Sequence, residues 1–125
     1  MLQKLEKILL WNNNLVGCIP SELGNCASLE VIDLSLNALS RIIPNTISYL
    51  NNLAKLQLNV NNSTGSIPSS LVNCTSLSQL HHGSNQIFGE IPDTLGQLKN
   101  LMLLLSWQNK LEGIVHPNIG NCKAL

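Results

Sequence analysis

Five asparagines recur along the chain at intervals of 24 residues, without an insertion or a deletion. They are Asn13, Asn37, Asn61, Asn85 and Asn109. Aliphatic residues keep the same interval in three further columns, which are Leu5, Leu29, Leu53, Leu77, Leu101 and Leu125; Ile8, Ile32, Leu56, Leu80 and Leu104; and Ile19, Ile43, Ile67, Ile91 and Val115. A strict period of this length indicates a stack of identical supersecondary units, so the fold follows from the period.

Each unit contains one segment with a period of two residues, which predicts a short β-strand. The predicted strands cover residues 7–11, 31–35, 55–59, 79–83 and 103–107. Their inward-facing pairs are Ile8/Leu10, Ile32/Leu34, Leu56/Leu58, Leu80/His82 and Leu104/Ser106. Because neighbouring units stack in parallel and alternate side chains point to opposite faces, we expect one parallel sheet with an outward, concave face.

A turn at the recurring asparagine follows each predicted strand. The asparagine side chain carries two donors and an acceptor, so it can bond backbone groups that no strand or helix satisfies. We therefore expect the five asparagines to form a structural ladder. A glycine and then Ile-Pro follow in most units, and the residues after the proline, such as 21–24 and 93–96, suit one helical turn on the convex side.

Composition excludes several function classes. The 125 residues include 7 basic and 7 acidic side chains, and no basic stripe is present, so nucleic-acid binding is not expected. No apolar run is long enough to cross a bilayer. The first ten residues do not resemble a signal peptide, and the repeat phase runs from about Leu2 to Leu125 without a distinct capping unit. We expect an internal piece of a longer solenoid or the product of a truncated gene.

The repeated phrase resembles the plant-type, extracellular leucine-rich repeat. Its diagnostic segment, L-x-G-x-I-P-x-x-L-G, is complete in LVGCIPSELG and nearly complete in IFGEIPDTLG. The resemblance implies an α/β fold, a right-handed leucine-rich-repeat solenoid with a parallel concave β-sheet and short 3-10 or helical turns on the convex side. One domain over residues 1–125 would hold about five repeats without caps, at 5–28, 29–52, 53–76, 77–100 and 101–124.

The wider phrases, such as GSIPSSLVNCTSLSQL and GEIPDTLGQLKNL, are similar to ectodomains of plant leucine-rich-repeat receptor-like serine/threonine kinases. They look most like the branch that includes receptors for root meristem growth factor peptides. The resemblance implies non-catalytic recognition of a secreted peptide or protein at the extracellular face of the plasma membrane, with a co-receptor of the same repeat type. The kinase and membrane segments would lie outside this chain. The alternatives are a free secreted repeat protein, such as an inhibitor of a cell-wall hydrolase, and a non-functional gene fragment.

Five positions depart from the repeat pattern. Arg41 stands where glycine is expected, Ser63 where leucine is expected, and His116 where proline is expected, while His82 and Ser106 occupy inward strand positions. Together these residues predict weaker packing in units three to five.

Nothing in the chain suggests catalysis, a cofactor or a metal. Adjacent His81 and His82 should face opposite sides of a strand, and no Cys-x-x-Cys spacing is present. Three cysteines, Cys26, Cys74 and Cys122, share one repeat phase and are expected to be small buried hydrophobes. Cys18 looks exposed, and either stays free or pairs with Cys26 or with a residue outside the chain.

Three N-glycosylation signals occur, at Asn61, Asn62 and Asn73. Asn61 is a ladder residue, so we expect it to be buried and unmodified. Asn62 and Asn73 are candidate sites if the chain enters the secretory pathway.

The predicted concave face carries three outward columns of side chains. These columns are Lys7, Val31, Lys55, Gln79 and Leu103; Leu9, Asp33, Gln57, His81 and Leu105; and Trp11, Ser35, Asn59, Gly83 and Trp107. Tryptophan is enriched at binding hot spots, and the only two in the chain bracket a polar middle. The candidate peptide-binding residues are therefore Trp11, Asp33, Gln57, His81 and Trp107; the alternative is that the tryptophans only cover the sheet locally.

Overall fold

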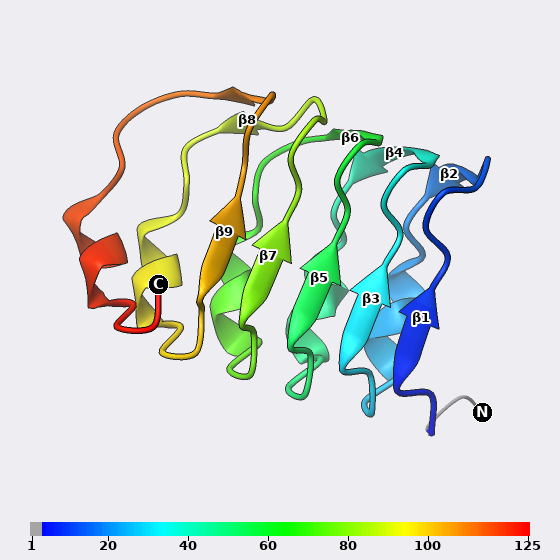
Figure 1. Cartoon of the computed structure of the whole chain (residues 1–125), viewed down its shortest axis with the longest axis horizontal. Coiled ribbons are helices and arrows are strands. Elements are labelled where there is room, and N and C mark those ends of the chain that lie inside the picture. Colours follow the sequence, from blue (N-terminus) through cyan, green and yellow to red (C-terminus); the bar gives the residue numbers. More distant parts are fainter. Residues whose placement is uncertain (1–3) are drawn as a thin grey trace.

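A computed structural model describes residues 4–125 as five stacked units that advance along one axis (Figure 1). One strand from each unit joins a five-stranded parallel sheet in the order β1-β3-β5-β7-β9. These strands are β1 (Lys7–Leu9), β3 (Val31–Asp33), β5 (Lys55–Gln57), β7 (Gln79–His81) and β9 (Leu103–Leu105). The predicted parallel sheet is confirmed, and neighbouring strands pair residues that are 24 apart in the sequence, such as Ile32 and Leu56.

The strands are shorter than the sequence predicts. Each has three residues instead of five, because the chain turns away after the third. Backbone hydrogen bonds to the next unit nevertheless continue into the turn, as in Leu34 N to Gln57 O at 2.9 Å and Leu36 N to Asn59 O at 2.9 Å. The residue before each ladder asparagine adopts a positive φ, between 50° and 58°, which ends the regular strand.

The core consists of aliphatic layers, with one layer from each unit. Ile32, Leu56 and Leu80 are at most 1% exposed, as the inward alternation predicts. The outer units are less covered, so Leu10 is 45% exposed although its alternation points inward. Apolar burial of this kind is the main favourable term in folding, at about 25 cal/mol per Å².

The five asparagines lie in a row at the turns. In each of the last four, Nδ2 donates to the carbonyl three residues earlier and to a carbonyl 27 residues earlier, while Oδ1 accepts from an amide 22 residues earlier. Asn61, for example, donates to Leu58 O (3.1 Å) and Leu34 O (2.9 Å) and accepts from Leu39 N (2.9 Å). Each of these side chains therefore ties its own unit to the preceding one. The same bonds recur at Asn37, Asn85 and Asn109.

A second layer of strands runs along the edge beyond the asparagine turns, at the top of Figure 1. One sheet contains β2 (Val16–Cys18), β4 (Ala38–Ile42) and β6 (Asn62–Thr64), and another contains β8 (Phe88–Gly89) and β10 (Lys110–Leu111). Their register is 22 residues, not 24, as in the pair Gly17 and Leu39. The sequence did not predict these strands, because they are short, two of them (β2 and β8) contain a glycine, and no alternation marks them.

The opposite face of the solenoid carries one 3-10 helix per unit, as predicted. These helices are η1 (Ser21–Asn25), η2 (Asn45–Tyr49), η3 (Ser69–Asn73), η4 (Asp93–Gln97) and η5 (Pro117–Asn121). A proline precedes each of the first four, and in the fifth His116 takes that place and accepts a hydrogen bond from Asn118 N through Nδ1. The imidazole therefore caps the helix. Within residues 4–125, no helix has the length and apolar character needed to span a bilayer.

The three cysteines in one phase are buried, and Cys18 is exposed. All four are unpaired, so the alternative of a Cys18–Cys26 disulfide is not realised in this structure. The Cys74 and Cys122 thiols donate to the carbonyls of Ile47 (3.2 Å) and Leu95 (3.1 Å) in the preceding units. Burial raises the pKa of Cys74 to about 11, so this thiol stays protonated.

The two inward polar residues form a pair across neighbouring units. His82 is fully buried in the column that holds Leu34 and Leu58, and its Nε2 lies 3.1 Å from Ser106 Oγ. The polar residue that replaces leucine in the fourth unit, His82, therefore has a polar partner in the fifth unit, Ser106. His82 Nδ1 and the Oγ of Ser63 are buried without a hydrogen-bond partner.

Arg41 adopts a φ of 68°, in the region that glycine occupies at Gly17, Gly65, Gly89 and Gly113. A non-glycine residue there costs about 1–2 kcal/mol. Arg41→Gly should therefore raise the free energy of unfolding by about 1 kcal/mol in a urea titration, after the entropic cost of glycine is subtracted.

Ser40→Gly is the matched control for Arg41→Gly, because Ser40 precedes Arg41 in β4 and does not have a positive φ. It should lower stability by about 0.5–1 kcal/mol, as glycine normally does within a strand. Equal losses in the two variants would show that Arg41 is not strained.

Candidate functional site

We define the sheet face as the outward side chains of the five-stranded sheet together with the outward residues that follow each strand. The register places Asp33, Gln57 and His81 side by side on β3, β5 and β7. Leu9 and Leu105 extend this row at the two ends. The middle of this row is therefore polar, and its two ends are apolar.

The Asp33 carboxylate is held in place by Ser35, two residues beyond the end of β3. Ser35 Oγ donates to Asp33 Oδ1 at 2.6 Å, and Ser35 N donates to the same oxygen at 3.1 Å. Asp33 is half-buried. The carboxylate therefore needs little reordering to accept a hydrogen bond from a ligand, which reduces the entropic cost of binding.

The two tryptophans are exposed at opposite ends of the sheet face, Trp11 by 54% and Trp107 by 47%. Gly83 and Ser35, in the same column, are buried. The His81 and Trp107 ring centroids are 5.9 Å apart, with the ring planes at 49°. Burial lowers the pKa of His81, against the opposing effect of the Asp33 charge, so the imidazole is neutral at neutral pH.

His81 and His82 lie on opposite faces of the sheet, so they cannot bind one metal ion together. His82 is enclosed in the core, and burial lowers its pKa to about 4. Across residues 4–125, no group of three His, Cys, Asp or Glu side chains is placed to hold a metal. Asp33 lies between Val31, Gln57 and Leu9 on the sheet face, so no second carboxylate adjoins it for acid–base catalysis.

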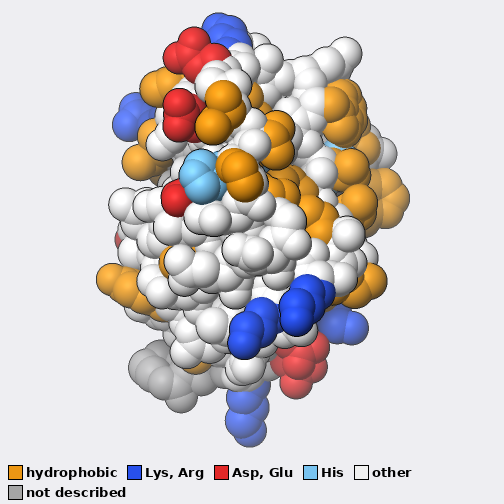
Figure 2. Space-filling view, turned by 90° about the vertical axis from the view of Figure 1, so that its left-hand side faces the viewer, with side chains coloured by type: hydrophobic (Ala, Val, Ile, Leu, Met, Phe, Trp, Pro, Cys, Tyr) orange, Lys and Arg blue, Asp and Glu red, His pale blue; other side chains and the backbone are white. Residues whose placement is uncertain are grey.

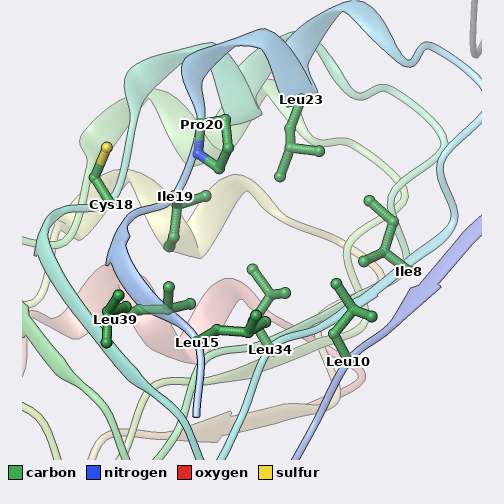
Figure 3. Close-up of a pocket in the computed structure, with 10 residues that line it drawn as sticks. Ile8, Leu10, Leu15, Cys18, Ile19, Pro20, Leu23, Leu34 and Leu39 are labelled. Carbon is green, nitrogen blue, oxygen red and sulfur yellow. The ribbon is translucent and has the colours of Figure 1, made fainter. Parts of the chain in front are cut away.

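A cavity of about 260 Å³ opens at the N-terminal end of the solenoid (Figure 3). Side chains from the first two units point into it, including Ile8, Leu10, Ile19, Leu23 and Leu34. These are the repeating core positions, and no convergent polar groups accompany them. Ligand sites normally combine an apolar lining with a few polar groups, so we do not assign a ligand to this cavity.

Hydrophobic side chains are also exposed at the other end. Figure 2 views the molecule from the side of the last unit, and hydrophobic side chains gather in its upper part. Ile114 (67%) and Val115 (71%) are among the most exposed apolar residues of this unit. Both ends of the described chain therefore present the apolar surface of a repeat layer.

The three glycosylation signals differ in accessibility. Asn61 is buried, as predicted. Its side-chain Nδ2 and Oδ1 make the ladder hydrogen bonds to Leu34 O, Leu58 O and Leu39 N. Asn62 in β6 and Asn73 at the end of η3 are exposed. Only Asn62 and Asn73 are accessible for modification in the folded chain.

Comparison with known proteins agrees with this geometry. The family model described as "Leucine rich repeat" matches residues 3–63. The chain has the leucine-rich-repeat solenoid fold. Over 52 residues, or 42% of its length, this leucine-rich repeat chain is 48% identical to Receptor-like protein kinase 7 of Arabidopsis thaliana, and it spans 5% of that kinase.

Two solved leucine-rich-repeat ectodomains of Arabidopsis thaliana superpose along nearly the whole chain. One is the receptor kinase GASSHO1/SCHENGEN3 in complex with CASPARIAN STRIP INTEGRITY FACTOR 2, with a TM-score of 0.95 and 38% identity over 98% of this chain and 15% of the ectodomain chain. The other is the receptor kinase HAESA with an IDA peptide hormone ligand, with a TM-score of 0.86 and 34% identity over 96% of this chain and 20% of that one. The leucine-rich repeat chain thus corresponds in length to less than a quarter of either ectodomain.

Of the five candidate residues, the register aligns Asp33, Gln57 and His81 in one row, and Trp107 lies beside His81. Trp11 is exposed after β1, and the binding role of all five stays a prediction.

The sequence alone did not reveal one feature of this face. This feature is the contact between Trp107 and the preceding unit, where the indole lies over Gly83. One feature of the sequence could have indicated this contact, because position 83 is a glycine where the two preceding units have Ser35 and Asn59. The repeat period, however, does not determine how the indole is oriented.

Proposed function

We propose that the sheet face recognises a secreted peptide or protein segment without covalent chemistry, as part of a plant receptor-like kinase ectodomain. The observation that carries this proposal is the pair of exposed tryptophans, Trp11 and Trp107, at the two ends of a polar row. Large aromatic side chains at such positions are typical binding hot spots. Solved ectodomains of the same fold were captured with peptide ligands, which supports a ligand of this class.

The dimensions suit an extended segment. Five strands at 4.7–4.9 Å span about 19 Å, which accommodates about six extended residues at 3.3 Å each. The ligand would contact Trp11, Asp33, Gln57, His81 and Trp107 in order along the units. A footprint of this size is smaller than the ~800 Å² per partner of a stable protein pair, so further contacts of a complete receptor would add to it.

In a complete receptor, the ligand-bound ectodomain would lie at the extracellular face of the plasma membrane and pair with a co-receptor of the same repeat type. The phrase similarity favours the branch that perceives root meristem growth factor peptides. Signalling by a serine/threonine kinase would then follow from ligand-dependent pairing.

The test is a micromolar titration of a randomised peptide library against the wild type, Trp11→Ala and Trp107→Ala. Each substitution should weaken binding of the selected peptides about tenfold, because truncating an aromatic hot spot costs more than 1 kcal/mol. Phe88→Ala is the matched control, because Phe88 is equally exposed at 54% but lies in β8, away from the sheet face. Unchanged binding in both tryptophan variants would show that the sheet face is not the site.

A further inference from the structure

The indole of Trp107 is seated on the preceding unit. A Cβ atom added to Gly83 would lie 2.7 Å from Cε2 and 2.8 Å from Nε1 of Trp107, so any side chain at position 83 would displace the ring. Gly83 is buried and does not have a positive φ, so its role is to leave room. We call the surface formed by His81, Gly83 and Trp107 the ring shelf.

The ring shelf differs from the rest of its column. At the equivalent positions in the second and third units, Ser35 and Asn59 carry polar side chains. Only the fourth unit combines a glycine with an aromatic ring from the next unit, and His81 adds a second ring, tilted by 49°. The shelf is therefore a local feature of this chain that the repeat itself does not require.

No carboxylate lies on the two strands that flank the ring shelf. The register places Lys55 and Gln57 of β5 on one side of β7, and Leu103 and Leu105 of β9 on the other. The nearest carboxylate in this row, Asp33 on β3, is two strands away, although its charge still acts on the His81 imidazole. A ligand cation bound over the indole would have no carboxylate on a neighbouring strand, whereas an apolar ring would contact Trp107, His81 and Leu105 together.

The strands beneath the shelf cannot pair with a ligand. β7 is hydrogen-bonded to β5 on one side and to β9 on the other, so its backbone groups are used within the sheet. A ligand crossing this face is therefore recognised through side chains and not by strand addition. This limitation increases the share of the affinity that one well-placed side chain must supply.

Resting on the proposed function, we propose that the ring shelf is the anchor point of the ligand and selects an aromatic side chain. Aromatic rings gain from tilted and offset contacts with other rings beyond their buried area, and the two tilted rings of the shelf offer both a face and an edge. Trp107 contacts the ligand directly. Gly83 is a positioning residue that leaves room for the indole.

The test uses the indole Nε1–H resonance of Trp107 in a ¹H–¹⁵N spectrum of the whole chain, assigned by comparison with Trp11→Phe. The probes are acetylated hexapeptides of glycine and serine with one central Phe, Leu, Arg or Glu. The Phe peptide should shift the resonance at a concentration at least fivefold lower than the Leu peptide, and the Arg and Glu peptides should be weaker still. In Gly83→Ala, which displaces the ring without removing it, the Phe preference should fall below twofold.

Two results would overturn the inference. The first is equal response to Phe and Leu peptides or a stronger response to Arg, and the second is an unchanged Phe preference in Gly83→Ala. If these occur while Trp11→Ala still weakens the library peptides, the sheet face remains the binding site and only the ring shelf is excluded. If Trp11→Ala and Trp107→Ala both bind the library peptides as tightly as the wild type, both proposals are contradicted.

Discussion

Replacing Asn61 by alanine should lower the free energy of unfolding by about 3 kcal/mol. The substitution leaves the buried amide of Leu39 without a partner and removes two hydrogen bonds to carbonyls. An orphaned buried group costs about 1–3 kcal/mol, and each lost bond costs about 0.5–1.5 kcal/mol. The two carbonyls keep other partners, since Leu34 O also accepts from Asn37 and Leu58 O from Asn85. Urea denaturation followed by circular dichroism measures the change.

Asn13→Ala is the matched control for Asn61→Ala, because Asn13 occupies the same repeat phase but is exposed. Its side-chain Nδ2 donates to Leu10 O (3.1 Å) and Trp11 O (3.2 Å), both within its own unit, and the substitution leaves the backbone hydrogen bond from Asn13 N to Leu36 O in place. Water can replace these bonds, so the loss should be below about 1 kcal/mol. Similar losses at the two positions would mean that the ladder does not hold the units together.

Acid should destabilise the fold through His82. Burial lowers the pKa of native His82 to about 4, whereas its ordinary value is about 6.5. The unfolded chain therefore binds a proton that the native chain does not, in the window between these values. The free energy of unfolding should fall as pH decreases from about 6.5 to about 4, by about 3 kcal/mol in total, and His82 should add no further slope below that window.

The control for this pH dependence is His82→Leu, which restores the leucine of the column and removes the titrating group. The difference in unfolding free energy between wild type and His82→Leu isolates the contribution of His82 from that of every other titrating group. A His82→Leu variant with an unchanged slope would show that another group is responsible.

Most of the fold could be predicted from the period. Ile32, Leu56 and Leu80 recur at one interval, and units of equal length can stack only with equal residues in register. The same reasoning places Asn61 between two units, because a buried amide needs partners on both sides. Position 41 shows its limit, since the pattern marks Arg41 as unusual but does not reveal that it adopts the backbone angle of glycine.

The second layer of strands and the pairing of His82 with Ser106 could not be predicted in the same way. These strands pair residues that are 22 apart, so they are shifted by two residues relative to the 24-residue repeat. The sequence period does not reveal such a shift. In the sequence, His82 and Ser106 are two separate deviations from the aliphatic pattern. Only the stacked structure shows that their side chains lie within hydrogen-bonding distance.

The candidate site also has some features that the sequence predicts and others that it does not. The alternation of side chains places Asp33, Gln57 and His81 on one face, and any strand of this phase would do so. The fixed Asp33 carboxylate and the seat of Trp107 on Gly83 depend on side-chain rotamers, which no period specifies. These two features give the sheet face its individual chemistry, so under the proposed function we expect them to decide which ligand it prefers.

We propose that the ligand binds the sheet face, and not the ends or the second layer of strands. Mapping of backbone ¹H–¹⁵N shifts with a library-selected peptide tests this proposal most directly. Perturbed resonances should concentrate at Asp33, Gln57, His81 and Gly83 and at the two indoles. Perturbations centred on β2, β4 and β6 or on the 3-10 helices, with the sheet face unchanged, would contradict it.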